Sequence, residues 1–294
     1  MDEARRRKIL DEAMDLFRKK GYSAASMQEI AEACGMAKAS IYKFFPSKED
    51  LFTAAFVDCH RTLLERANEL DRSGSELRLP PRERLRRKIE FQLFYTVENH
   101  LFMIDFRELP ITSNENFAAA WKRKKAALLA WRKELLLEAY GERIEPFVWD
   151  AVAIFRGILF EYLGYVIQKV IAVPIPELAA YIVDRMDAVT EDLARSNAKP
   201  ILNEASAYYH HLNPSDPLVR QGTAMQFLQS LDEKIGELPK DEEARGELRE
   251  VVGLLRKEAG ADAPNPTLIR VLSSYLESVP ELRPYVRQLN LMLS

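Results

Sequence analysis

Residues 26–51 constrain the fold more than any other part of the chain, because they carry the signals of two short helices joined by a tight turn. Ser26 and Glu29 have the spacing of a capping box, in which each side chain bonds the backbone amide of the other residue. Gly35 follows the first helix, at a position where a sharp turn often needs a positive φ. This layout is typical of a helix-turn-helix, whose second helix enters a DNA major groove.

The second helix of this pattern is predicted over residues 39–44, before Pro46, and has a polar outer face. Ile41 is its inward residue. Small outward side chains let a helix approach base edges, and Lys, Ser and Tyr side chains bind phosphates. We expect DNA contacts from Ser26, Lys38, Ala39, Ser40, Tyr42, Lys43 and Lys48. The alternative is an ordinary helical hairpin with a solvated polar face, because this spacing alone is a loose signal.

A longer pattern between residues 6 and 56 separates these two interpretations. Its most specific part is the run Gly35-x4-Ser-x-Tyr-x-Phe-Phe-x-x-Lys-x-x-Leu. The further matching residues are Ile9, Leu10, Ala13, Phe17, Gly21, Tyr22, Ser26, Ile30, Ala31, Ala33, Ile41 and Phe56. Together they resemble the DNA-binding domain of TetR/AcrR-family transcriptional regulators, although Ser26 and Met36 stand where that family often has Thr and Val.

The resemblance covers the first fifth of the chain firmly, the next half in general character, and the last third not at all. It implies an all-α protein with an N-terminal three-helix DNA-binding domain and a helical regulatory domain. It also implies a homodimer that binds double-stranded DNA at a palindromic operator and, as a repressor, is released by a small ligand.

The charge distribution places any DNA contact at the N-terminus. The chain has a net charge of −3, which argues against a protein that coats nucleic acid indiscriminately. Residues 1–50 carry 10 Lys and Arg against 9 Asp and Glu, whereas residues 200–294 carry 10 against 14. The basic run at residues 5–8 either adds an arm-like DNA contact or forms a solvated tail.

Other functional classes find little support in the sequence. The chain has no GxGxxG, GxxxxGKS, HExxH or GxSxG motif, so we expect neither an enzyme nor a cofactor. Cys34 and Cys59 lack partners at metal-ligand spacing, so we expect reduced thiols in a cytoplasmic protein and no metal site. Charged residues interrupt the most apolar stretch, 147–173, so membrane insertion is not expected.

The length of 294 residues is comfortable for two or three domains. Proline, glycine and polar breaks predict helices at 48–70, 82–99, 115–140, 147–173 and 177–196, and four more after residue 200. We therefore predict a DNA-binding domain at 1–50, a ligand-binding and dimerisation domain at 51–199, and a C-terminal helical extension at 200–294.

Aromatic residues are frequent in the middle region, and we expect most of them to fill a helical core. A subset would line a pocket for a small apolar or amphipathic effector. The candidates are Phe91, Phe94, Tyr95, Phe102, Phe106, Trp121, Phe155 and Arg156. Arg156 interrupts an apolar face and would pair with an acidic effector or with an internal carboxylate, of which we favour the second.

The helix predicted at 147–173 has a narrow face with two glycines seven residues apart, which allows close approach of another backbone. In the resembling family the last two regulatory helices form a four-helix bundle across a two-fold axis. We therefore predict a dimer interface at Gly157, Glu161, Gly164 and Gln168, on the face that also carries Asp150. The alternative is a solvated strip, which accounts for the polar residues but not for the glycines.

Residues 200–294 are predicted to form an acidic group of four amphipathic helices, preceded by loops that contain His210-His211. DNA phosphates repel such a surface, so it favours a protein partner or the dimer mate. Two functions therefore remain open. One is a ligand-released repressor, and the other is a DNA-binding protein that recruits a protein partner through these helices without a small effector.

Overall fold

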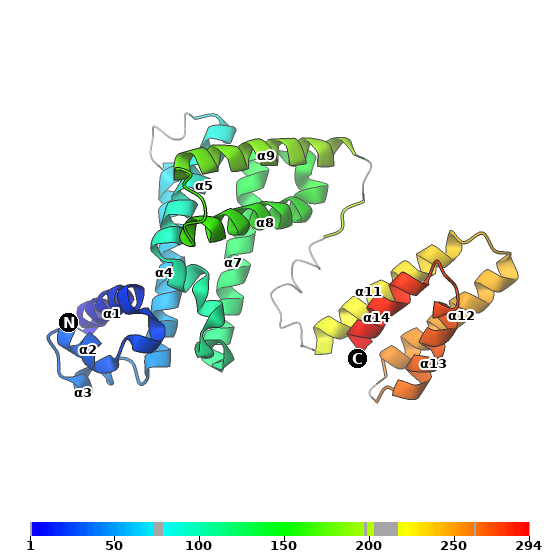
Figure 1. The fold of residues 1–294 in the computed structure, drawn as a ribbon, viewed down its shortest axis with the longest axis horizontal. Helices are drawn as coiled ribbons and strands as arrows, with labels where there is room; N and C mark the ends of the chain where they lie inside the picture. Colours follow the sequence, from blue (N-terminus) through cyan, green and yellow to red (C-terminus); the bar gives the residue numbers. More distant parts are fainter. Residues whose placement is uncertain (1, 73–78, 197–198, 203–216, 262, 294) are drawn as a thin grey trace. The chain divides into compact units, whose positions relative to one another are not determined.

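The computed structural model describes residues 2–72, 79–196, 199–202, 217–261 and 263–293 (Figure 1). Within these ranges every regular element is a helix, which confirms the all-α prediction. The chain divides into two compact units, Met1–His211 and Leu212–Ser294. No helix among the described residues is both long and apolar enough to cross a membrane. The loop predicted around His210-His211 lies outside the described ranges.

The first unit holds three N-terminal helices, a long connecting helix and a set of regulatory helices (Figure 1). In chain order they are α1 (Asp2–Ala24), α2 (Met27–Ala33), α3 (Lys38–Ile41), α4 (Lys48–Arg72), α5 (Pro81–Glu98), α6 (His100–Met103), the 3-10 turns η1 (Asp105–Glu108) and η2 (Pro110–Ser113), α7 (Glu115–Tyr140), η3 (Glu142–Phe147), α8 (Val148–Ile167) and α9 (Ile175–Arg195).

Two helices end earlier than the sequence pattern predicts. In α3 the amides of Phe44 and Phe45 both donate to the Ile41 carbonyl, at 2.9 Å each, so the chain tightens into a turn before Pro46. In α8, Lys169 adopts a positive φ of 57°, and the Val170 amide donates to the Tyr165 carbonyl at 2.9 Å. This is a helix-ending motif that usually contains glycine, and no glycine marks it here, so the pattern did not predict this end of α8.

The core of the first unit runs across the predicted boundary between residues 50 and 51. One buried cluster joins Phe17 of α1, Phe52 of α4, Phe102 of α6 and Phe117 of α7. The Phe52 ring centroid lies 5.3 Å from that of Phe17 and 5.1 Å from that of Phe102. A second cluster packs α5, α7, α8 and α9 against one another. The N-terminal helices therefore share one packed interior with the first regulatory helices.

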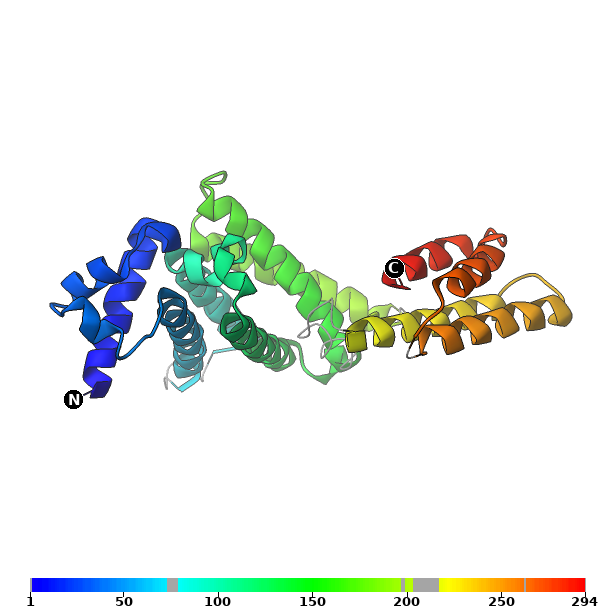
Figure 2. The same cartoon turned by 90° about the horizontal axis from the view of Figure 1, so that it is seen from below.

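The second unit is a four-helix bundle of α11 (Pro217–Gly236), α12 (Glu242–Ala259), α13 (Pro266–Glu277) and α14 (Arg283–Leu293). Both α12 and α14 contact α11 and α13, so the four helices close around one apolar core (Figures 1 and 2). Leu228, Leu255 and Leu276 are fully buried there. The four helices predicted after residue 200 are confirmed, with boundaries shifted by a few residues.

Candidate DNA-binding site

The turn between α2 and α3 has the geometry that its sequence predicts. Gly35 has a φ of 66°, and the Met36 amide donates to the Ala31 carbonyl at 2.9 Å. At the start of α2, the Glu29 amide donates to Ser26 Oγ at 3.2 Å, and the Ser26 amide donates to Glu29 Oε2 at 3.0 Å. The capping box is therefore present, and both ends of α2 are fixed by local bonds.

The outer face of α3 and of the turn after it is open. Lys38, Ala39, Tyr42 and Lys43 are exposed, and Ser40 is half-buried. Beneath them Ile41 and Phe45 are buried in the core. The structure thus brings five predicted DNA contacts together on one surface, in the arrangement that an inserted helix requires.

The other two predicted DNA contacts, Ser26 and Lys48, lie at helix starts next to this surface. The Lys48 ammonium donates to the Ser23 carbonyl at 3.2 Å and lies 4.5 Å from the centre of the Tyr22 ring. Burial lowers the pKa of Lys48. The Lys48 ammonium thus has two contacts with the end of α1, one with a backbone carbonyl and one with an aromatic ring. A separate ion pair lies at the start of α2, where the Lys20 ammonium is 2.6 Å from a Glu29 carboxylate oxygen. Hydrogen bonds from Lys20 and Ser26 lower the pKa of the Glu29 carboxyl to about 2.

The side chains of the basic run at residues 5–8 lie in different places. Arg7 turns to the protein and donates to Asp58 at 2.9 Å. Arg5 and Lys8 instead line a cleft of about 680 Å³, together with Ser40 and Lys43. Sequence reasoning did not include Arg5 and Lys8 among the site residues. Their i, i+3 spacing, which places both on one helix face, was the available signal.

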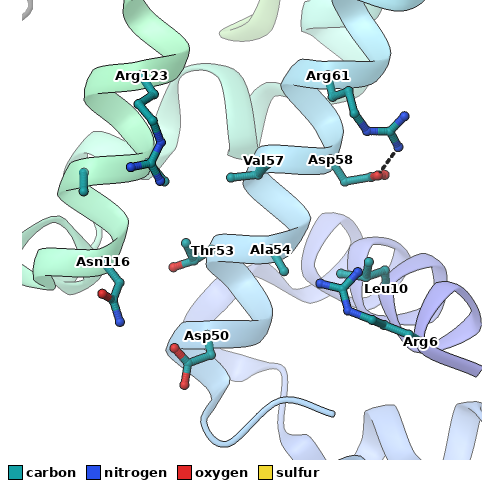
Figure 3. Close-up of a pocket in the computed structure, with 12 residues that line it drawn as sticks. Arg6, Leu10, Asp50, Thr53, Ala54, Val57, Asp58, Arg61, Asn116 and Arg123 are labelled. Atoms are coloured by element: carbon teal, nitrogen blue, oxygen red, sulfur yellow. Dashed lines mark hydrogen bonds and ion pairs between the residues drawn. The ribbon is translucent and has the colours of Figure 1, made fainter. Parts of the chain in front are cut away.

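A groove of about 540 Å³ lies where the N-terminal helices meet the regulatory helices. Arg6 of α1 and Arg123 of α7 flank it, and Thr53 and Val57 of α4 lie between them (Figure 3). Asp58, at the same junction, holds Arg7 of α1 as well as Arg61 of α4. Polar contacts thus add to the shared aromatic core in fixing α1 on α4.

The predicted ligand residues divide among several places in the regulatory helices. Phe106, Trp121 and Arg156 line one cavity of about 400 Å³. Tyr95 is buried and donates to the Cys59 carbonyl at 2.7 Å, with the Phe91 ring 5.8 Å away. The remaining residues are Phe102 and Phe155, which are fully buried in the two cores, and Phe94, which is 45% exposed.

Next to this cavity lies a buried histidine that no motif predicted. His60 is 1% exposed, its Nδ1 lies 2.9 Å from the Phe56 carbonyl oxygen, and its Nε2 has no hydrogen-bond partner among the described residues. Burial lowers the pKa of His60 to about 4, and the positive charges of Lys124 and Arg132 act in the same direction. His60 is therefore neutral in the folded protein at neutral pH.

Acidification is expected to destabilise the fold through His60. Between its unfolded pKa, near 6.5, and about 4, only the unfolded chain binds the proton, so stability falls as the pH falls through this window. His60→Phe should reduce the slope by up to about 1.4 kcal/mol per pH unit. Urea unfolding at pH 7 and pH 5 measures this. His100→Gln, at the part-exposed His100, is the control, and an unchanged slope in His60→Phe would contradict the assignment.

The predicted dimer residues lie along α8. Gly157, Glu161 and Gln168 are exposed, and Gly164 is half-buried. A Cβ on either glycine would meet no atom within 4 Å in the part of the chain that the structure describes. Ile154 and Tyr165 flank them and are each 38% exposed. At the start of the same face, Asp150 accepts hydrogen bonds at 3.0 Å from the amides of residues 201 and 202. The chain thus covers one end of this face itself and leaves the rest open.

Comparisons with known proteins agree with this geometry. Residues 9–55 match the family described as "Bacterial regulatory proteins, tetR family". The transcriptional regulator YuxN of Bacillus subtilis is 27% identical over 290 residues, which cover 97% of this chain and 96% of YuxN. The repressor KstR of Rhodococcus jostii is 35% identical over 77 residues, which cover 26% of this chain and 32% of KstR.

A solved TetR-family structure from Mesorhizobium loti shows the same fold. It covers 64% of this chain and 96% of its own, with a TM-score of 0.50 and 19% identity. The fold and the N-terminal surface define a helix-turn-helix DNA-binding protein. The chain is a TetR-family transcriptional regulator, which belongs to a non-enzymatic family.

Proposed function

We propose that this regulator is a homodimeric repressor that binds a palindromic operator and releases it when a small ligand binds. The observation that carries the proposal is the open face of α3, where Lys38, Ala39, Tyr42 and Lys43 are exposed above a buried Ile41. KstR and the IcaR proteins of two Staphylococcus species are named as repressors or negative regulators. Since bacterial DNA lies in the cytoplasm, a repressor of this kind would act there.

The open face of α8 supports the homodimer. Its exposed apolar side chains and its two glycines leave a surface on which a second copy packs closely. Since each subunit then presents one α3, the operator has two half-sites related by two-fold symmetry. Selection of bound fragments from genomic DNA tests the proposal. Recovery of no common sequence, or of one without a repeated half-site, would overturn it.

Lys48→Ala is expected to weaken DNA binding without changing the preferred sequence. The ammonium is held near the start of α4, where backbone amides also favour a phosphate. Because a lost phosphate contact lowers the salt dependence, the slope of log affinity against log salt should fall by about one unit per subunit. Titrations of operator and of random DNA at several salt concentrations measure this. Lys257→Ala, an exposed lysine on α12, is the control. A changed sequence preference would contradict the phosphate role.

The role of the C-terminal bundle stays a prediction. YuxN matches this chain over almost its full length, so the extension has a counterpart in that relative. Leu268, Val271 and Tyr275 leave an exposed apolar row on α13. Such a row supports a protein contact at this unit.

A further inference from the structure

The cleft of about 680 Å³ beside α3 gathers positive charge from two parts of the N-terminal domain. Arg5 and Lys8 reach it from α1, and Ser40 and Lys43 reach it from α3 and the turn that follows. None of the described residues that line the cleft is acidic. Glu12, one turn further along α1 than Lys8, does not line it. The cleft is therefore strongly positive in a chain whose net charge is −3.

Two of these cations keep donors that the protein itself does not use. An ammonium group has three N–H donors. The Lys8 ammonium donates to the Cys34 carbonyl at 3.0 Å, at the end of α2. Arg5 is exposed and has no hydrogen bond or ion pair with another described residue. Lys8 is thus attached to the frame of the helix-turn-helix, and its other donors and the Arg5 guanidinium stay available to a ligand.

The position of the cleft favours the DNA backbone as that ligand. Ser40 and Lys43 also belong to the outer surface that is proposed to enter the major groove. The major groove is about 12 Å wide, and a helix with its side chains is about 10–12 Å across. A group directly beside the inserted helix therefore meets the sugar-phosphate strand that borders the groove. Guanidinium and ammonium groups form charge-assisted hydrogen bonds with phosphate oxygens.

The cleft and Lys48 lie toward opposite ends of α1. Lys48 contacts Ser23 and Tyr22 near the C-terminal end, whereas Lys8 lies near the N-terminal end. At a rise of about 1.5 Å per residue, Lys8 and Tyr22 are about 20 Å apart. This separation is larger than the width of the major groove, so one phosphate cannot serve both sites. The two sites therefore suit the two backbone strands that border the groove.

We propose that Arg5 and Lys8 bind a DNA phosphate on the strand across the major groove from the phosphate bound by Lys48. This inference rests on the proposed function and adds a second backbone contact to each half-site. A phosphate contact carries no sequence information directly, so this one raises affinity and fixes the register of α3 in the groove. Because each subunit binds one half-site, the contact is made twice per operator.

Phosphate-ethylation interference on the selected operator tests the inference with the full-length protein. Ethylation of one phosphate per half-site should weaken binding of the wild type but not of Arg5→Gln, and Lys8→Gln should be insensitive at the same phosphate. Lys48→Ala should be insensitive at a different phosphate, on the other strand. In Arg5→Gln the slope of log affinity against log salt should fall by about 0.9 unit per subunit, with the preferred sequence unchanged.

Lys19→Gln is the matched control, because Lys19 is an exposed lysine of α1 that pairs with Asp15 at 2.6 Å and does not line the cleft. It should leave the interference pattern and the salt slope unchanged, and thermal melts should show that all variants are folded. An unchanged slope in a folded Arg5→Gln would overturn the inference. The same result follows if Arg5→Gln and Lys48→Ala lose sensitivity at one shared phosphate.

The proposed function is scored separately, by selection of genomic DNA. If no common operator were recovered, that function would fall, while salt titrations on random DNA would still measure the phosphate contact of Arg5. If an operator with repeated half-sites were recovered and the Arg5→Gln slope did not change, the inference alone would fall.

Discussion

Gly35→Val is expected to reduce operator affinity by about 100-fold or more. A β-branched residue at a φ of 66° costs on the order of 1–3 kcal/mol, and the chain relieves this strain by moving the turn. The turn sets the angle between α2 and α3, so the exposed face of α3 no longer meets the bases. Each lost base contact costs about 1–3 kcal/mol, and a dimer loses it in both half-sites. Titration of selected operator DNA measures the loss.

Two variants separate this effect from general instability. Asn tolerates positive φ better than other non-glycine residues, so Gly35→Asn should retain most of the affinity. Gly141 has a φ of 74° at the end of α7, so Gly141→Val introduces comparable strain away from α3. It should lower the melting temperature but leave the affinity of the folded protein nearly unchanged. Equal losses of affinity in Gly35→Val and Gly141→Val would contradict the role of the turn.

Gly164→Leu is expected to convert the proposed dimer to a monomer and to remove most operator binding. A Cβ at this position meets no atom of the described residues within 4 Å in one protomer, so we expect the substitution to act mainly on a second copy. Gly in a helix interior is less stable than Leu by roughly 0.5–1 kcal/mol, so the monomer itself should unfold at a slightly higher temperature. Sedimentation measures the mass, and a melt measures the stability.

Gly246→Leu is the matched control, because Gly246 lies in α12 and its Cβ also meets no atom within 4 Å. It should gain the same helix stability and leave the mass and the DNA affinity unchanged. A Gly164→Leu protein that sediments as a stable dimer with normal affinity would remove Gly164 from the interface. A monomer that binds the whole operator as tightly as the wild type would contradict the two-half-site mechanism.

The sequence predicts the DNA-binding turn well because the signals there are local. Ser26 and Glu29 are three residues apart, and Gly35 fixes its turn through its own φ, so neither needs a distant partner. The end of α8 is a different case. Lys169 adopts a positive φ without glycine, and only the bonds of the completed turn make this conformation stable.

The regulatory interior depends on contacts between residues far apart in the sequence. Asp150 holds the amide of residue 201, and Lys88 of α5 pairs with Glu138 of α7 at 2.8 Å. The helical periodicity of the sequence does not predict pairs between residues so far apart. The burial of Arg132 and His60 was likewise not predicted, because a single cation or histidine in a helical pattern is expected to be solvated or hydrogen-bonded. These two buried residues could therefore be identified only once the helices were placed.

The shared aromatic core makes the DNA-binding segment depend on helices outside it. Phe17 and Phe52 are covered by Phe102 and Phe117, which both lie outside the matched family segment of residues 9–55. Excision of that segment would expose two phenyl rings to water. Grafting onto another regulator succeeds only where the recipient supplies aromatic rings of matching shape. We therefore expect specificity for a new operator to change more readily through residues on the outer surface of α3 than through exchange of the whole segment.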